Sequence, residues 1–148
     1  MSRKPTLTKV SRDDQKNIPP AKSKGFETYP VVCKQYNPIP GVGAGLMYVS
    51  PGAEDRTWED FAIWDILFCE SGEMIVEETD DDGETIAEVH ADPGDYVVLA
   101  PEGGNYTFKS SGEPTTILFV NITPGSDKSW DPASGYGKEY GEKMSQLD

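Results

Sequence analysis

The sequence predicts an all-β domain, built either as a sandwich or as a closed barrel. Short segments rich in Val, Ile, Tyr, Phe and Thr recur along most of its 148 residues. Clusters of Gly, Pro and Asp, such as "SPGAED", "DDDGE" and "SSGEP", separate these segments and have the chemistry of turns. No internal segment shows a 3.6-residue apolar period long enough for a helix. About eight short strands at near-regular spacing are typical of a sandwich or barrel.

The predicted strands follow one another from one turn cluster to the next. In chain order they are Val31–Tyr36, Ala44–Val49, Ala62–Cys69, Met74–Glu78, Thr85–His90, Tyr96–Leu99, Tyr106–Lys109 and Thr116–Thr123. "NPIPGVG" and "SPGAED" end the first two, and "ESGE" separates the third from the fourth. "DDDGE" has the composition of a hairpin tip, and "DPGD", "PEGG" and "SSGEP" separate the remaining strands.

The two ends of the chain differ from this middle part. Residues 1–28 are polar and lack an apolar period, so we expect a flexible or partner-docked N-terminal arm. Residues 29–124 form the predicted barrel domain. Residues 125–148 form a polar C-terminal tail with three aromatic residues, so we expect part of it to pack on the barrel or on a second subunit. These aromatic residues are Trp130, Tyr136 and Tyr140.

The charge of the chain excludes some classes of partner. Its formal net charge is -13 and its pI is about 4.4, which argues against binding to nucleic acid or to anionic membranes. No apolar run approaches the roughly 20 residues that span a bilayer. The basic N-terminal segment is not followed by an apolar core of a signal peptide, so we expect a cytoplasmic location.

Cysteine and histidine are too few for a common zinc site. Cys33 and Cys69 lie in apolar segments, and we expect them to be reduced thiols in the core. His90 is the single histidine, and no CxxC or HxxxH spacing is present. Because His90 lies near a turn at the end of a predicted strand, we expect it at the surface.

Two segments resemble the two motifs of the cupin superfamily, a family of small jelly-roll barrels. They are "SPGAEDRTWEDFAIWDILFCESGEM" and "PGDYVVLAPEGGNYTF", and the resemblance covers roughly residues 44–124. It implies an all-β, cupin-type jelly-roll β-barrel. Within the superfamily, "WDILFCESGEMIV" and "ILFVNITPGSDKSW" look most like the cupin domain of ethanolamine-utilisation proteins.

The residues at the metal-binding positions of the motifs depart from the family pattern. The family's first motif supplies two histidines and an acid. Aligned from its Pro-Gly and from Gly72, it places Trp58 and Asp60 at the histidine positions and Asp65 at the acid. The histidine of the second motif falls on Tyr106, with Asn105 as an alternative.

This replacement argues against a metal cofactor. The indole of Trp58 does not coordinate metals, and a tyrosine ionises near pH 10. Cupin metal sites use imidazole nitrogens with one carboxylate, and two carboxylates alone make a weak site for hard cations. We therefore expect neither a bound metal nor another cofactor.

The same alignment predicts a pocket in the mouth of the barrel. Strand alternation places Ile63, Leu67 and Cys69 on the face of Asp65, and Tyr106 on the face of Phe108. The predicted catalytic residues are Asp65, Tyr106 and Asp60. The predicted substrate-binding residues are Trp58, Phe108, Leu67, Ile63 and Asn105.

An aspartate in an apolar pocket gains a raised pKa, and a tyrosine hydroxyl can stabilise an enolate. This predicts a metal-independent enzyme that acts on a small carbonyl-containing metabolite by proton transfer, as an isomerase or as a lyase or dehydratase. The alternative is a non-catalytic cupin that binds a small molecule, or an accessory protein of a pathway such as ethanolamine utilisation. A carboxylate within hydrogen-bond reach of Tyr106 beside an open cavity favours the enzyme.

Structural roles for the same residues stay open. In these alternatives, Asp65 caps a strand or accepts a hydrogen bond from a buried tyrosine hydroxyl, and Trp58 fills the inside of the barrel. Tyr106 then fills the space that the metal occupies in other cupins. Cupins commonly pair, with N-terminal arms that add to the partner's sheet, so the resemblance also implies a homodimer.

Overall fold

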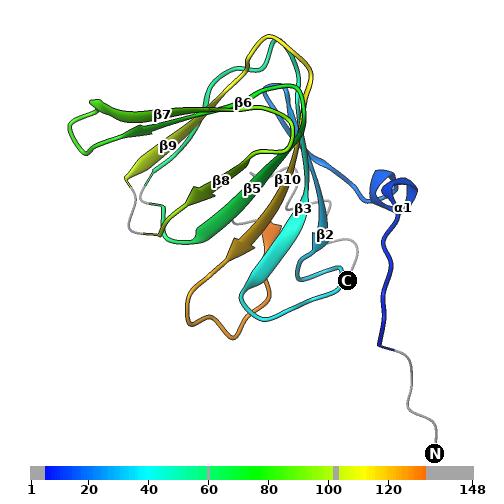
Figure 1. Ribbon diagram of the computed structural model, residues 1–148. Coiled ribbons are helices and arrows are strands. Elements are labelled where there is room, and N and C mark those ends of the chain that lie inside the picture. Colours follow the sequence, from blue (N-terminus) through cyan, green and yellow to red (C-terminus); the bar gives the residue numbers. More distant parts are fainter. Residues whose placement is uncertain (1–5, 60, 102–103, 133–148) are drawn as a thin grey trace, which may run out of the picture.

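The computed structural model describes residues 6–59, 61–101 and 104–132, which form two antiparallel β-sheets (Figure 1). The larger sheet has the order β1-β2-β3-β10-β5-β8, with β1 Ala21–Ser23, β2 Phe26–Val32, β3 Val42–Val49, β10 Thr115–Ile122, β5 Trp64–Ser71 and β8 Tyr96–Leu99. The smaller sheet has the order β4-β9-β6-β7, with β4 Arg56–Trp58, β9 Asn105–Lys109, β6 Met74–Thr79 and β7 Thr85–Ala91. In Figure 1 the two sheets lie close together at one end and diverge toward the other. The predicted all-β jelly-roll architecture is confirmed.

One apolar core lies between the sheets because side chains alternate between the two faces of each strand. In β10, Ile117 and Phe119 point inward and are buried, whereas Val120 between Phe119 and Asn121 is exposed. The buried cluster consists of Phe26, Met47, Val49, Leu67, Cys69, Met74, Val76, Ala91, Val97, Leu99, Tyr106, Phe108, Ile117 and Phe119. Each large apolar side chain buried here contributes about 1.5–3 kcal/mol. Cys33 and Cys69 are free and buried, as predicted.

The first predicted strand is displaced toward the N-terminus. The sequence pattern favoured Val31–Tyr36, but β2 ends at Val32. Cys33 and Tyr36 exchange backbone hydrogen bonds of 2.8 and 3.2 Å, which closes a turn. Asn37 then adopts a φ of 46°, the left-handed region that ends an extended segment. The short strands β1 and β4 were not predicted, since three residues carry no detectable alternation.

Part of the segment expected to be an N-terminal arm packs on its own barrel, where Gln15, Ile18 and Ala21 are buried, whereas residues 6–10 are exposed. It contains the short helix α1 Arg12–Lys16, strand β1, and the beginning of β2. Ser11 and Asp14 cap α1 reciprocally, each side chain accepting from the other's backbone N–H. An Arg12–Glu70 ion pair of 3.2 Å ties the helix to β5. No helix in the described ranges has the length and apolarity needed to cross a bilayer.

The first residues of the tail also pack on the barrel, in accord with one of the two expectations for this segment. Trp130 lies edge-on to Phe119 at 5.8 Å between ring centroids, against the core. Gly43 provides the space, because a Cβ at this position would collide with the Trp130 ring. Tyr136 and Tyr140 lie outside the described residues.

Candidate functional site

A pocket of about 420 Å³ opens between β8 of the larger sheet and the β6–β7 hairpin of the smaller sheet. This volume falls in the range of about 300–1,000 Å³ that small-molecule sites occupy. The described residues that line it are Val76, Glu78, Ala87, Val89, Val97, Val98, Leu99, Ala100 and Tyr106. Among these lining residues, aliphatic side chains make most of the wall and only Glu78 and Tyr106 are polar.

Tyr106 reaches the pocket from β9. The ring of Phe61 lies edge-on to the ring of Tyr106, with centroids 5.2 Å apart. The Tyr106 hydroxyl donates a hydrogen bond to the Ala100 carbonyl at 3.5 Å. Burial raises the pKa of Tyr106; the Ala100 carbonyl lowers it, and the neighbouring Glu78 carboxylate raises it again. Because the net shift of the pKa is upward, the hydroxyl stays protonated at neutral pH. Its O–H can donate to a ligand only if the long 3.5 Å bond to the Ala100 carbonyl is given up.

Glu78 is the functional candidate that sequence reasoning missed. It lies on β6 directly opposite Tyr106 on β9 and opposite Ala87 on β7. Met74, Val76 and Glu78 share the inward face of β6, so the alternation of this strand signals that Glu78 points toward the pocket. The pairing of β6 with β9 then brings its carboxylate beside the Tyr106 hydroxyl.

Asp65 points inward from β5, as predicted, but it is not among the described residues that line the pocket. Its cross-strand neighbours are Asn121 on β10 and Leu99 on β8. Its Oδ1 atom is buried and has no hydrogen-bond partner among the described residues, and the same holds for Oδ1 of Asn121. Burial raises the pKa of Asp65 from 3.8 to about 7. Among the described residues that line the pocket, the carboxylate that accompanies Tyr106 is therefore that of Glu78.

The remaining described site residues that were predicted lie in the core or are half-buried. Phe108 and Leu67 are buried in the core, and neither lines the pocket in the described part of the chain. Ile63 precedes β5 and is half-buried, and Asn105 begins β9 opposite Thr79. The third predicted catalytic residue, Asp60, lies outside the described residues.

Trp58 packs against the core from the wall of the barrel. Its ring lies edge-on to Phe108 with centroids 4.8 Å apart, and the Arg56 guanidinium stacks over it at 4.9 Å. Trp58 is half-buried against the core and is absent from the described pocket lining. Packing therefore accounts for Trp58, in line with the structural alternative for this residue.

The described side chains at the motif positions do not fit a cupin metal site. Trp58 offers no ligand, and the Tyr106 hydroxyl is protonated and already bonded. Within the described ranges, no three His, Cys, Asp or Glu side chains come together as a ligand set. Among the described residues at these positions only Asp65 offers a carboxylate, which is a poor anchor for a divalent ion, and we derive no chemistry through a metal.

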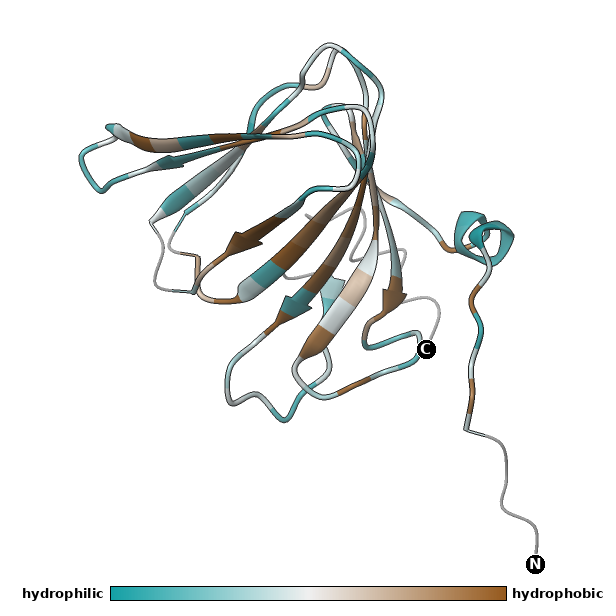
Figure 2. Cartoon of the chain, in the orientation of Figure 1, coloured by the Kyte–Doolittle hydropathy of each residue, from teal (hydrophilic) through white to brown (hydrophobic). Residues whose placement is uncertain are grey.

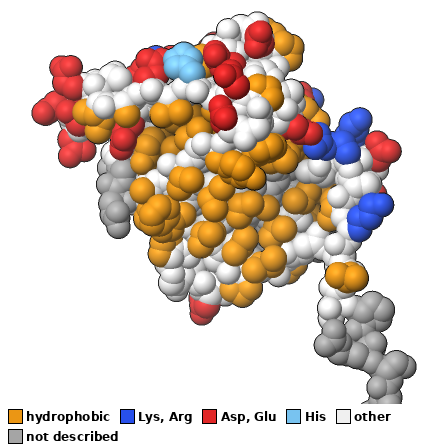
Figure 3. Space-filling view, in the orientation of Figure 1, with side chains coloured by type: hydrophobic (Ala, Val, Ile, Leu, Met, Phe, Trp, Pro, Cys, Tyr) orange, Lys and Arg blue, Asp and Glu red, His pale blue; other side chains and the backbone are white. Residues whose placement is uncertain are grey.

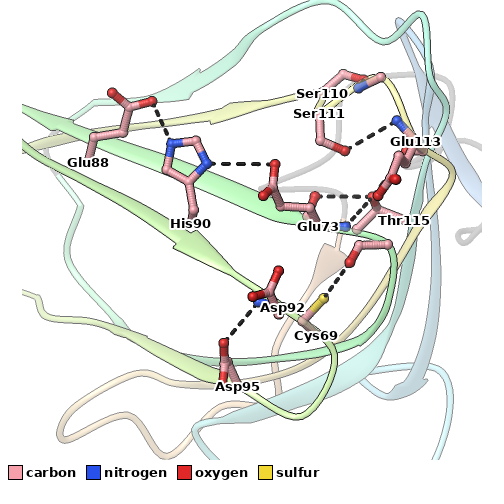
Figure 4. A network of polar contacts seen from close by, with 12 residues as sticks. Cys69, Glu73, Glu88, His90, Asp92, Asp95, Ser110, Ser111, Glu113 and Thr115 are labelled. Carbon is pink, nitrogen blue, oxygen red and sulfur yellow. Dashed lines mark hydrogen bonds and ion pairs between the residues drawn. The ribbon is translucent and has the colours of Figure 1, made fainter.

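His90 lies on the surface, as predicted. Figure 4 shows its ring between two carboxylates, Glu88 at 3.2 Å and Glu73 at 3.6 Å. The Glu73 backbone also exchanges hydrogen bonds with the Thr115 hydroxyl, which links β6 to β10 near the same place. His90 does not belong to the described pocket lining, so it has no place in the chemistry of the pocket.

No protein-family model matches the chain, and no curated protein is similar to it in sequence. Solved structures are similar in fold. Ectoine synthase from P. lautus shares 14% identity at a TM-score of 0.59, over 82% of this chain and 80% of that chain. The cupin domain of Schizosaccharomyces pombe Cnp3 shares 14% identity at a TM-score of 0.53, over 66% and 61%.

A putative ethanolamine utilization protein Q from Salmonella typhimurium shares 18% identity at a TM-score of 0.49, over 66% of this chain and 68% of that chain. This likeness is too low to support an argument about pathway. The arrangement of the two sheets and the similar structures together show that the chain has the cupin fold.

Proposed function

We propose that the chain binds a small carbonyl-containing metabolite in the pocket between β8 and β6–β7 and transfers a proton on it without a metal. The observation that carries this proposal is the meeting of the Tyr106 hydroxyl and the Glu78 carboxylate at the wall of that pocket. A hydrogen-bond donor beside a carboxylate in an otherwise aliphatic pocket is the arrangement that proton transfer next to a carbonyl requires.

The two side chains have complementary roles in the proposed reaction. The Glu78 carboxylate removes a proton from the carbon next to the carbonyl, and the electron pair of the broken C–H bond forms an enolate. The Tyr106 hydroxyl donates a hydrogen bond to the enolate oxygen and so stabilises its charge. In an isomerase the Glu78 carboxyl then returns the proton to another carbon of the conjugated enolate as the carbonyl re-forms. In a lyase the carbonyl re-forms, the electron pair makes a C–C double bond, the bond from the β-carbon to the leaving group breaks, and the Glu78 carboxyl protonates the departing group.

The aliphatic wall strengthens this chemistry. Val76, Val97 and Leu99 surround the polar pair and exclude water, and a hydrogen bond to a developing charge is stronger in such a medium than in water. In this proposal Glu78 takes the role of base that the sequence motif suggested for Asp65. The separation of Asp65 from the described pocket lining is the reason for the exchange.

Solvent deuterium exchange tests the proposal and does not require the product to be identified. We would incubate the full chain in D₂O with 2-oxo acids, 3-oxo acids, hydroxyketones and aldehydes, and follow deuterium at the α-carbon by NMR. Wild-type protein exchanges at least one class. Glu78→Gln lowers the rate by about 10²–10⁴-fold, and Tyr106→Phe lowers it by about 10²–10³-fold.

Glu77→Gln is the matched control. Glu77 is the next residue of β6, points to the opposite face, and pairs with Lys109 at 2.6 Å. The same change of charge at Glu77 leaves the exchange rate unaltered. Exchange that is equally fast in Glu78→Gln and Tyr106→Phe would overturn the proposal, as would the absence of both exchange and binding with every class.

The composition of the pocket also favours a second function, binding without turnover. Apart from Glu78 and Tyr106, every described lining side chain is aliphatic, and this suffices to bind a small apolar ligand. Saturable binding with no exchange in wild-type protein, lost in Tyr106→Phe, identifies the protein as a binder and rejects the enzyme.

A further inference from the structure

The pocket beside Glu78 and Tyr106 has walls without a positive charge in the part of the chain that the structure describes. Among the described residues that line it, none is Lys, Arg or His. Strands β6, β7, β8 and β9 supply nearly all of these residues, and Lys109 is the single Lys or Arg on the four strands. Figure 2 shows β8, which forms one wall, as strongly hydrophobic. The described side chains therefore offer a ligand one carboxylate, one hydroxyl and an aliphatic surface.

Lys109 does not compensate for the lack of a cation in the pocket. It lies opposite Ile75 of β6 and follows Phe108 of the inner face, so its side chain leaves on the outer face of the smaller sheet. Its Nζ atom pairs there with Glu77 at 2.6 Å. The hydrogen bond within this pair raises the pKa of Lys109 and lowers the pKa of Glu77. The charge of Lys109 is thus matched on the side of the sheet that faces away from the pocket.

The charges of the whole chain are distributed unevenly. Residues 1–34 contain eight of the 13 Lys and Arg residues and three of the 26 Asp and Glu residues, so their formal charge is +5, whereas residues 35–148 carry -18. The basic segment leads into β1, which is the edge of the larger sheet opposite to β8. Figure 3 shows Lys and Arg side chains on the side of α1, and Asp and Glu side chains at the tip of the β6–β7 hairpin. The pocket therefore lies toward the acidic side of the molecule.

We infer that the substrate is an uncharged carbonyl compound, a ketone, aldehyde or ester, and that the pocket rejects oxo acids and phosphorylated carbonyl compounds. This inference rests on the proposed function, because it takes Glu78 as the base and Tyr106 as the hydrogen-bond donor. Proteins commonly hold the carboxylate or phosphate of a ligand with Arg or Lys. The described walls provide neither, and the Glu78 carboxylate and the acidic side of the molecule repel an anion.

The charge that develops during the reaction adds to this selection. When Glu78 takes the α-proton of an uncharged ketone, the electron pair of the C–H bond forms an enolate with one negative charge, which the Tyr106 hydroxyl stabilises. The same step on an oxo acid gives a dianion, because the carboxylate keeps its own charge. Tyr106 is the single hydrogen-bond donor among the described lining side chains. The second charge would then lie against an aliphatic wall, where an unpaired charge is costly.

A cationic substrate is disfavoured for a different reason. Its ammonium group is attracted to the acidic side of the molecule, but Glu78 is the only carboxylate among the described residues that line the pocket. An ion pair with the substrate would occupy the carboxylate that has to take the proton. Both kinds of charge are thus unfavourable, and the pocket selects substrates that carry none.

Matched pairs of carbonyl compounds test the inference with the full chain. We would measure α-carbon deuterium exchange in D₂O for pyruvate, acetoacetate and levulinate, each beside its methyl ester, and divide every rate by the rate in buffer alone. The acid and the ester of a pair are similar in shape and differ in charge at neutral pH. For every pair that the wild-type protein exchanges, we expect the kcat/KM of the ester to exceed that of the acid by at least about 10-fold.

Val89→Lys introduces a positive charge into the wall. Val89 lies on β7 and is 43% exposed, so a lysine at this position can lay its stem along the wall without repacking the core. We expect it to lower the preference for the ester by at least about 10-fold. His90→Lys, at the next residue of β7, is the matched control. His90 faces the other side of the sheet beside Glu88 and Glu73, so this variant keeps the wild-type preference.

The possible outcomes separate this inference from the proposed function. An acid that wild-type protein exchanges as fast as its ester overturns the inference and leaves the proposed proton transfer intact, and a preference that Val89→Lys does not change also overturns the inference. Exchange of no compound, with esters bound more tightly than acids in ligand-observed NMR, rejects proton transfer and supports the selection of uncharged ligands. Neither exchange nor binding of any ester overturns both.

Discussion

Replacing Asp65 by Asn isolates the energetic effect of one buried carboxyl group. Asp65 is held between Asn121 and Leu99 on the inner face of the larger sheet, and its Oδ1 atom has no partner among the described residues. Burial raises its pKa from 3.8 to about 7. Asn has nearly the same shape and no ionisation, so Asp65→Asn removes the titration and keeps the packing.

The sign of the effect follows from proton binding. Between pH 4 and pH 7 the unfolded chain ionises Asp65, whereas the folded chain keeps it protonated. The stability due to the neutral carboxyl is therefore complete below about pH 4, is lost as pH rises to about 7, and stays constant above that. At 1.36 kcal/mol per pKa unit, a rise from 3.8 to about 7 corresponds to a loss of about 4 kcal/mol in the free energy of unfolding.

Urea denaturation followed by tryptophan fluorescence measures this loss. About two pKa units of the shift lie between pH 5 and pH 7, so we expect the stability of Asp65→Asn relative to wild type to rise by about 3 kcal/mol from pH 5 to pH 8. Asp81→Asn, at the exposed tip of the β6–β7 hairpin, is the control and keeps the wild-type pH dependence. Parallel pH profiles for wild type and Asp65→Asn would refute the burial of an unpaired carboxyl.

Two further substitutions test the packing around the site. Gly45→Ala places a Cβ against the Tyr29 carbonyl and the Pro30 backbone of β2. We therefore expect the free energy of unfolding, measured by urea denaturation, to fall by about 1–3 kcal/mol. An unchanged free energy of unfolding would contradict the close approach of β2 and β3. Leu67→Ala leaves a cavity in the core and costs about 2–5 kcal/mol of stability, with ligand affinity unchanged because Leu67 is outside the described pocket lining. A loss of ligand affinity at wild-type stability would contradict that placement.

The fold was predictable because its signals are local. Alternation along β5 correctly placed Asp65 and Leu67 on one face, and alternation along β9 placed Tyr106 and Phe108 on one face; the structure has both faces turned toward the core. Turn clusters marked most strand ends. The predicted bounds of the first strand were wrong for a local reason as well. Two backbone hydrogen bonds close a turn after Val32, and such a turn leaves no mark in the alternation of apolar and polar residues.

The candidate site was less predictable because it depends on pairing between distant strands. Alternation indicates that Glu78 points inward, but only the register of β6 against β9 shows that it meets Tyr106. The family motif suggested Asp65 instead. Asp65 lies on β5 of the larger sheet, next to Leu99, and only Leu99 of these two is among the described residues that line the pocket. Helix α1 in the N-terminal segment was not predicted, since a five-residue helix held by Ser11 and an ion pair has no apolar period.

The crystal structure of Glu78→Gln bound to a compound that wild-type protein exchanges in D₂O tests the central claim most directly. The account predicts the carbonyl oxygen about 2.7–3.1 Å from the Tyr106 hydroxyl, with the α-carbon facing residue 78. A compound bound elsewhere, for example against Asp65 and Asn121, would contradict the assignment of the site.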